Sequence, residues 1–259
     1  MSTAAPIIEL IDARLRFGED KEILRGVQLA VRARERLVVL GQSGSGKSTL
    51  LRLILGILKP TGGSIKFKGL EVTRMGRRRL NKMRQKIGMV YQYSALISSL
   101  SVRENLALPL EELTDKSAAE IDSRIDEKLQ MVGLTEVRDK MPAELSGGMK
   151  KRVGLARALM IDPEVILYDE PSAGLDPVIS SVIDALIIEM SEKIGATSII
   201  VTHEMESAFR IASRIAMLYE GKILAEGTPE EIQKHQDPVV RQFIRGETEG
   251  PILIDQAAP

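Results

Sequence analysis

The stretch Gly41-Gln-Ser-Gly-Ser-Gly46-Lys47-Ser48 matches the phosphate-loop pattern G-x-x-x-x-G-K-[ST] and decides the fold class. Apolar residues at 37–40 predict a buried strand before it, and residues 47–55 predict a helix after it. Strand, glycine-rich turn and helix in this order are the context that the motif requires. A chance match somewhere in such a chain has a probability on the order of 1%.

This loop has the residue types that bind a phosphate chain. Glycines let the backbone approach the phosphates closely, and loop N–H groups with the helix N-terminus offer partial positive charge. Lys47 adds a full charge for the β- and γ-phosphates, and the Ser48 hydroxyl can bind Mg²⁺. We therefore predict ATP and Mg²⁺ as cofactors. The predicted nucleotide-binding residues of the loop are Gly41, Ser43, Gly44, Ser45, Gly46, Lys47, Ser48 and Thr49.

Strand and helix patterns alternate along most of the chain. The predicted strands after the loop lie at 88–91, 165–168, 198–202 and 215–219, and helices follow at 177–193 and 205–212. Such alternation predicts a mainly parallel sheet with helices on both faces. The patterns at 7–17 and 27–31 predict antiparallel strands. From about 94 to 160 the spacing of apolar residues is helical, with few strand signals, which predicts an inserted helical lobe. The expected fold is an α/β P-loop core with an N-terminal antiparallel β subdomain.

Composition limits the possible classes of function. The 259 residues suit one domain with two lobes, and equal numbers of basic and acidic residues (36 each) give no indication of nucleic-acid binding. A local basic run at 74–86 is either a solvated helix face or a contact for lipid headgroups or an acidic partner. Cysteine is absent, which excludes disulfides and thiolate zinc sites. We expect no signal peptide, and the sequence contains no apolar stretch of about 20 residues. We therefore expect a partner to supply any membrane span.

Two carboxylates end the apolar strand at 165–168. At the carboxyl end of a parallel strand, Asp169 and Glu170 are expected to face the ligand crevice. Asp169 is placed to hold Mg²⁺ through water, and Glu170 is the candidate base that polarises an attacking water. An apolar run ending in Asp-Glu has little weight alone, but it gains weight from the phosphate loop upstream.

The order of further motifs resembles that of ABC ATPases over nearly the whole chain. After the phosphate loop come Gln92, the stretch Leu145-Ser146-Gly147-Gly148, Asp169-Glu170, Ser172-Ala-Gly-Leu-Asp176, and His203 at a strand end. Taken alone, the stretch at 145–148 is only a helix N-cap. The six motifs in this order make the resemblance very specific, and they imply an ABC nucleotide-binding domain that hydrolyses ATP.

The resemblance implies roles for individual residues. Phe17 resembles the aromatic residue that stacks on adenine; otherwise it is a core residue. Gln92 resembles the residue that senses Mg²⁺ and nucleotide, which makes it a metal and catalytic candidate. His203 would contact the γ-phosphate and position the water. The residues that would act across a dimer seam, on ATP held by a second copy, are Ser146, Gly147, Gly148 and Asp176.

One position departs from the usual signature, which reads LSGGQ in this family; here Met149 replaces the glutamine. The runs LSGGMKKRVGLARAL and YDEPSAGLDPV resemble the ATPases of lipid transporters that work with MCE-domain proteins. The tail from Asp237 to Ile252 resembles the ending of the maintenance-of-lipid-asymmetry branch in Gram-negative bacteria. The resemblance implies phospholipid transport across or from the bacterial inner membrane. The subunit would lie on its cytoplasmic side, held there by a permease.

The resemblance also implies partners. One phosphate loop and one signature in each chain imply an ATP-sandwich homodimer beneath an integral membrane permease. An MCE-domain lipid-binding protein and a STAS-domain protein would complete the complex. The alternatives are single-domain relatives without a transport function: a cell-division ATPase that transmits force, or an iron–sulfur assembly ATPase.

The C-terminal end is expected to be a tail that follows the ATPase domain. The ATPase domain is predicted at 1–235 and a tail at 236–259, with one short helix after Thr228 and polar residues beyond. Within the tail, Val239, Val240, Phe243 and Ile244 fall on one helical face, and 252–254 is apolar. We expect this tail to dock on the second copy; the alternatives are docking on its own subunit, or disorder beyond Gly246.

Overall fold

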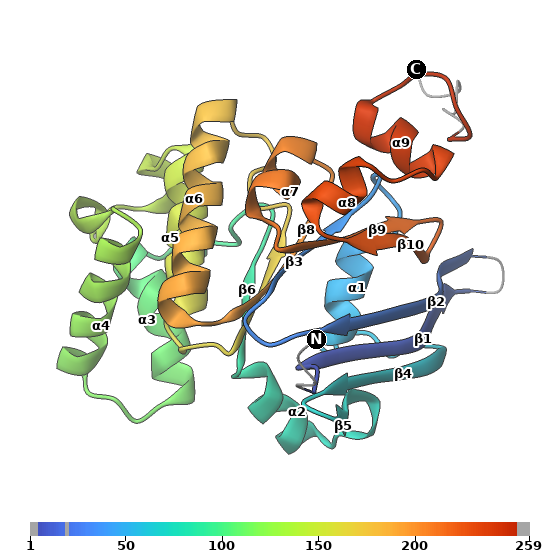
Figure 1. The fold of residues 1–259 in the computed structure, drawn as a ribbon. Helices are drawn as coiled ribbons and strands as arrows, with labels where there is room; N and C mark the ends of the chain where they lie inside the picture. Colours follow the sequence, from blue (N-terminus) through green and yellow to red (C-terminus); the bar gives the residue numbers. More distant parts are fainter. Residues whose placement is uncertain (1–4, 19–20, 253–259) are drawn as a thin grey trace.

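The computed structural model describes residues 5–18 and 21–252 and contains two sheets and a helical lobe (Figure 1). The larger sheet has the order β10-β9-β3-β8-β7-β6, in which only β10 runs antiparallel to its neighbour. Its strands are β3 (Arg36–Leu40), β6 (Ile87–Val90), β7 (Val165–Asp169), β8 (Thr197–Thr202), β9 (Arg214–Tyr219) and β10 (Lys222–Gly227). The predicted parallel core is confirmed, with strand bounds within a residue or two of those expected.

The smaller sheet is antiparallel and has the order β2-β1-β4-β5. Its strands are β1 (Ile8–Phe17), β2 (Lys21–Val31), β4 (Gly62–Phe67) and β5 (Leu70–Glu71). The first two confirm the predicted antiparallel subdomain, whereas β4 and β5 were not predicted. Two glycines open β4, and at Gly63 a Cβ would lie 2.1 Å from the Asp12 backbone oxygen. Glycine is thus required by backbone contact with β1, although its strand propensity is low.

The helices surround the parallel sheet and form the lobe at the left of Figure 1. The core helices are α1 (Lys47–Ile54), α2 (Arg77–Arg84), α6 (Pro177–Ile194) and α7 (Met205–Ile211), and the lobe consists of α3 (Val102–Leu113), α4 (Ala118–Met131) and α5 (Gly147–Leu159). Short 3₁₀ turns occur at Val72–Arg74, Thr135–Val137 and Pro142–Glu144. Asp176 caps α6, because its Oδ1 accepts from the N–H groups of Val178 and Ile179 at 3.0 Å each.

Both faces of the parallel sheet are buried, as expected for parallel strands. Alternate residues of β3 belong to two separate hydrophobic cores, one on each face of the sheet. Leu37 and Val39 pack toward α1 and the smaller sheet, while Val38 and Leu40 pack toward the lobe. All four side chains are fully buried. The strand ends are therefore held between two hydrophobic cores, which makes them a rigid base for a site.

The basic run lies on α2. Most of its charged side chains are exposed, as the solvated-face interpretation predicts. Arg84 differs from the others: its guanidinium donates to the backbone oxygens of Leu55 and Gly56 at 3.0 Å each. A cation at the C-terminal end of α1 stabilises the carbonyl groups that end the helix.

The prediction of a single short helix followed by a polar tail is wrong. Two helices follow β10, namely α8 (Pro229–Gln233) and α9 (Pro238–Arg245). The side chain of Val240 is fully buried in the core of its own subunit, and Val239, Phe243 and Ile244 pack against the same core. The apolar face expected to dock on a second copy thus packs within its own chain. Residues 253 and 254 lie outside the described part of the chain.

Gln242 extends this packing beyond α9. Its buried side-chain amide accepts from Ile252 N at 2.7 Å and donates to Ile252 O at 3.3 Å, as one strand residue does with another.

In the part of the chain that the structure describes, no helix combines the length and the low charge needed to cross a bilayer.

Replacing Val240 with alanine should lower the free energy of unfolding by about 1–3 kcal/mol, because buried methyl groups are lost from the core. Urea unfolding of the nucleotide-free chain measures the change. Arg241→Ala is the matched control, since its side chain on the same helix is exposed. Equal unfolding midpoints for the two variants would show that α9 does not pack on its own subunit.

Candidate functional site

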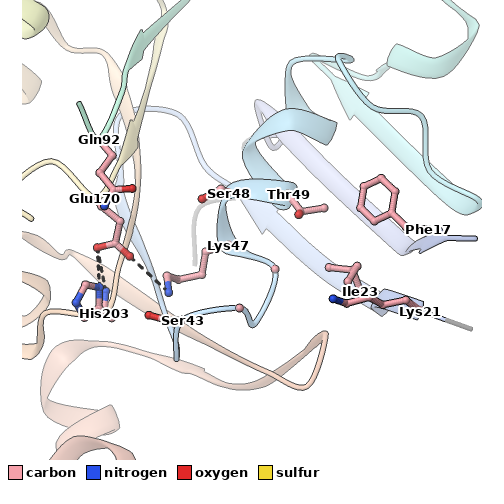
Figure 2. A pocket seen from close by; sticks show the side chains of 12 residues that line it. Phe17, Lys21, Ile23, Ser43, Lys47, Ser48, Thr49, Gln92, Glu170 and His203 are labelled. Carbon is pink, nitrogen blue, oxygen red and sulfur yellow. Dashed lines mark hydrogen bonds and ion pairs between the residues drawn. The ribbon is translucent and has the colours of Figure 1, made fainter. Parts of the chain in front are cut away.

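The carboxyl ends of the parallel strands border a cleft with a volume of about 560 Å³ (Figure 2). One wall comes from the phosphate loop and the loops after β6, β7 and β8, and the other from the antiparallel sheet. The lining residues are Phe17, Lys21, Ile23, Ser43, Gly44, Gly46, Lys47, Ser48, Thr49, Gln92, Glu170 and His203. The structure therefore brings together residues that lie far apart in sequence.

The phosphate loop needs glycine at two positions for steric reasons. Gly41 is buried, and a Cβ there would lie 2.3 Å from the Leu218 backbone oxygen. Gly46 has a φ of +105° at the start of α1, and a Cβ there would lie 2.9 Å from Leu24 Cδ2. Both the conformation and the space exclude a side chain at Gly46. The result is a turn of bare backbone at the N-terminus of a helix, which suits an anion.

Lys47 is buried inside this loop and holds it in a closed turn. Its Nζ donates to the backbone oxygens of Gly41 at 2.7 Å and Gln42 at 3.0 Å. Burial lowers the pKa of Lys47 from its usual value, and the nearby negative charge of Glu170 opposes that shift. Figure 2 shows the ammonium group pointing toward Glu170, whose Oε1 lies 3.5 Å away. The positive charge of the Lys47 ammonium group thus lies where phosphate oxygens would bind.

Two oxygen ligands meet beside the loop. Ser48 Oγ donates to Asp169 Oδ1 at 2.8 Å, and of these two residues Ser48 lines the cleft. Burial raises the pKa of Asp169, whereas the Ser48 hydrogen bond lowers it. A hydroxyl and a carboxylate are hard oxygen ligands of the kind that Mg²⁺ prefers, so this pair fits the predicted metal.

Glu170 is held in an unusual backbone conformation, with a φ of +47°. Its N–H donates to Val201 O at 2.9 Å, which fixes it at the end of β7. Its Oε2 accepts from Thr202 Oγ1 at 3.1 Å. It also accepts from His203 Nδ1 at 3.0 Å, as Figure 2 shows. A carboxylate can only accept, so His203 carries the proton on Nδ1. Both donors act on Oε2, which leaves Oε1 facing Lys47.

Sequence reasoning missed Lys151 and Thr202. Lys151 is buried, and its Nζ donates to Gln92 O at 2.5 Å and to Glu170 O at 3.1 Å. One ammonium group therefore connects the loop after β6 with the loop after β7. Burial lowers the pKa of Lys151, against the attraction of nearby carboxylates. In the sequence it stands in a Lys-Lys pair that is typical of a solvated face. The position of Thr202, directly before His203 at a strand end, could have identified it.

The signature residues lie outside the cleft. None of Ser146, Gly147, Gly148 and Asp176 lines it. Ser146 caps α5, with Oγ accepting from Met149 N at 3.3 Å, and both Ser146 and Gly147 are exposed. A Cβ on Gly148 would lie 2.6 Å from Ile179 Cγ2, so glycine is needed for α5 to pack on α6. One chain thus presents a cleft and a separate exposed helix start.

Residues 24–173 match the family model described as ABC transporter, which is more than half of the chain. The chain is 41% identical to "Probable ribonucleotide transport ATP-binding protein mkl" of Mycobacterium leprae, over 91% of this chain and 68% of that protein. It is equally identical to "Methionine import ATP-binding protein MetN" of Brucella abortus (94% and 66%) and to "Protein TRIGALACTOSYLDIACYLGLYCEROL 3, chloroplastic" of Arabidopsis thaliana (95% and 75%). The chain spans about two thirds to three quarters of the length of these relatives.

Solved structures agree with this assignment. CbiO1 of Clostridium perfringens, part of an ABC transporter complex, superposes with a TM-score of 0.83 at 32% identity, covering 92% of this chain and 94% of CbiO1. The ATP-binding cassette MJ0796, solved as a dimer bound to ADP and Pi, gives 0.79 at 33% identity, covering 86% and 98%. The chain belongs to the ABC transporter family; it is an ABC ATPase that uses ATP and Mg²⁺.

Alanine at Gly46 should destabilise the protein more than alanine at Gly44. Both glycines have positive φ, but only Gly46 lacks room for a methyl group, and nothing lies within 4 Å of a Cβ on Gly44. Backbone strain of about 1–3 kcal/mol is expected at both positions, with the steric clash added at Gly46. Thermal unfolding without nucleotide measures the difference. A Gly44→Ala variant as unstable as Gly46→Ala would contradict the packing described for the loop.

Proposed function

We propose that this chain is the ATP-hydrolysing subunit of a transporter that energises phospholipid movement across or from the bacterial inner membrane. It would lie at the cytoplasmic face of that membrane, held by a permease. The observation that carries the enzymatic part is the meeting of Lys47, the Ser48–Asp169 pair and the Glu170–His203 pair around one cleft.

Each wall of the cleft has a separate proposed role in binding nucleotide. Phe17 lines the cleft from the antiparallel sheet and is 46% exposed, which leaves a ring face free for adenine. The loop at 41–49 would hold the phosphates through backbone N–H groups. Lys47 would exchange its carbonyl and carboxylate partners for phosphate oxygens. Because Lys47 is already buried, the phosphates gain a desolvated positive charge.

The Ser48–Asp169 pair would hold the metal, with Gln92 approaching from the loop after β6. A bound Mg²⁺ would supply positive charge that neutralises the charge developing on the phosphate oxygens. Asp169 would contribute a negative charge to the metal site, and Ser48 would contribute a neutral oxygen. Binding of the cation would oppose the effect of burial and favour the ionised form of Asp169.

Glu170 is the proposed base, and its two oxygens are not equivalent. Oε2 already accepts two side-chain hydrogen bonds and so fixes the direction of the carboxylate. Oε1 contacts only Lys47 among the described ion pairs, and it becomes available when Lys47 turns to phosphate. Oε1 would then accept the proton of the attacking water. His203 would orient that water and the carboxylate together.

The exposed signature requires a second copy in this account. Ser146, Gly147 and Gly148 at the start of α5 would bind the phosphates held by the other chain, and Asp176 would lie at the seam. The dimeric solved state of MJ0796 with ADP and Pi supports such an arrangement. Two chains would therefore form two composite sites.

The lipid assignment rests on the resemblance of the runs at 145–159 and 168–178 to lipid-transporter ATPases, and on a 41% identical relative named for trigalactosyldiacylglycerol. The proposed partners are a permease, an MCE-domain protein and a STAS-domain protein. Relatives of the same identity are named for methionine import and ribonucleotide transport, so identity alone does not select the substrate.

Glu170→Gln should bind ATP but lower turnover by at least about 100-fold, because the general base is lost while the charge at Lys47 and the metal pair remain. With ATP and Mg²⁺ the variant should elute as a stable dimer in size-exclusion chromatography. Glu189→Gln, which changes an exposed carboxylate on α6, is the matched control and should turn over normally. Normal hydrolysis by Glu170→Gln would show that another group accepts the proton.

Affinity purification of this chain from its native membrane should recover a permease and an MCE-domain protein. The purified complex in phospholipid vesicles should move labelled phospholipid only with ATP, and the Glu170→Gln complex should not. Recovery of a methionine or nucleotide permease, or of soluble iron–sulfur or cell-division proteins alone, would contradict the phospholipid assignment and leave the ATPase assignment intact.

A further inference from the structure

Buried polar side chains join α6 and α7 behind the catalytic cleft. Asp184, in the middle of α6, is fully buried. Its carboxylate accepts from Ser207 Oγ at 2.6 Å and from Arg210 Nη1 at 2.6 Å, both on α7. A buried carboxylate with two such partners fixes the position and the hydrogen direction of each.

Ser172 continues this chain of contacts toward the cleft. Its hydroxyl is buried, donates to Glu204 Oε2 at 2.8 Å and lies 3.4 Å from Ser207 Oγ. Ser172 is two residues beyond Glu170, and Glu204 directly follows His203. The Glu204 N–H donates to Thr202 Oγ1 at 3.0 Å, and Thr202 donates to Glu170. The contacts therefore run without a break from Asp184 to the proposed base.

Counting hydrogens shows that Ser172 has two alternative acceptors. A serine hydroxyl has a single hydrogen. Ser207 gives its hydrogen to Asp184, so toward Ser172 its oxygen can only accept. Ser172 now gives its hydrogen to Glu204 and could give it to Ser207 instead after a small rotation. Asp184 thus keeps a second acceptor available beside Ser172.

This second acceptor makes movement of the His203–Glu204 segment less costly. If Glu204 moved away, Ser172 would otherwise be left as an unpaired buried hydroxyl, which is unfavourable. A cavity of about 300 Å³ borders Asp184, Glu204, Ser207 and Arg210 and gives the Glu204 side chain room to move. His203 is adjacent to Glu204, so a shift of this segment would also move the His203 ring.

We propose that Asp184 and Ser207 are positioning residues that act through Ser172: they let Ser172 exchange Glu204 for Ser207 as His203 shifts during the hydrolytic cycle. Neither residue lines the nucleotide cleft. The inference rests on the proposed roles of Glu170 and His203. It predicts an effect on turnover without an effect on nucleotide affinity.

Ser207→Ala in the full chain tests this exchange by removing the second acceptor. The kcat for ATP hydrolysis should fall about 3- to 10-fold, the effect of one hydrogen bond of ordinary strength, while KM for ATP stays within about twofold. Ser191→Ala is the matched control, since it removes another buried hydroxyl, bonded to Ala196 O near the end of α6. It should lose comparable stability in urea and keep its kcat.

A second comparison separates the exchange from packing of α7. In a Ser172→Ala background, Ser207→Ala should cause no further loss of kcat, because the hydroxyl that uses the second acceptor is already gone. A kcat for Ser207→Ala within twofold of the parent overturns the proposal, as does a full additional loss in the Ser172→Ala background or a tenfold rise in KM. A parent chain without ATPase activity would instead contradict the proposed function.

Discussion

The site depends on the parallel register between β3, β8 and β7. Leu40 pairs with Thr202, and Asp169 pairs with Val201, so three strands end at nearly the same level of the sheet. The phosphate loop, Asp169-Glu170 and His203 therefore enter one cleft from neighbouring strands. Because side chains alternate between the two faces, a slip of one residue in β7 would move its side chains to the opposite core. The two hydrophobic cores that flank the sheet resist such a slip.

The polar and charged groups in and beside the cleft are paired with one another. Lys47 is next to Glu170, and Asp169 shares a hydrogen bond with Ser48. Each contact uses groups that the proposed mechanism assigns to phosphate, metal or water. A buried charge without a partner is costly, so these contacts stabilise the loop. Of the two contacts, the one between Lys47 and Glu170 is the longer, at 3.5 Å, and is the one that a phosphate would replace.

Much of this arrangement could be predicted from the sequence because local patterns carried it. The phosphate loop and the strand ending in Asp169-Glu170 are contiguous signals, and each lies where expected. The contacts that depend on distant packing had no such signal. Lys151 is buried although its sequence context is that of a surface lysine, and α9 packs its apolar face on its own core. The partner of a side chain is a property of the tertiary structure, which periodicity does not contain.

The central claim is that the phosphate loop of one copy meets the signature of another. The chain has no cysteine, so a pair of engineered cysteines can report on this contact without competing disulfides from native cysteines. One chain would carry Ser43→Cys and another Ser146→Cys, each with Glu170→Gln, and the two would be mixed and oxidised under mild conditions. With ATP and Mg²⁺ the account predicts a disulfide between the unlike chains, and little linkage without nucleotide. Linkage only between like chains, or no dependence on ATP, would contradict it.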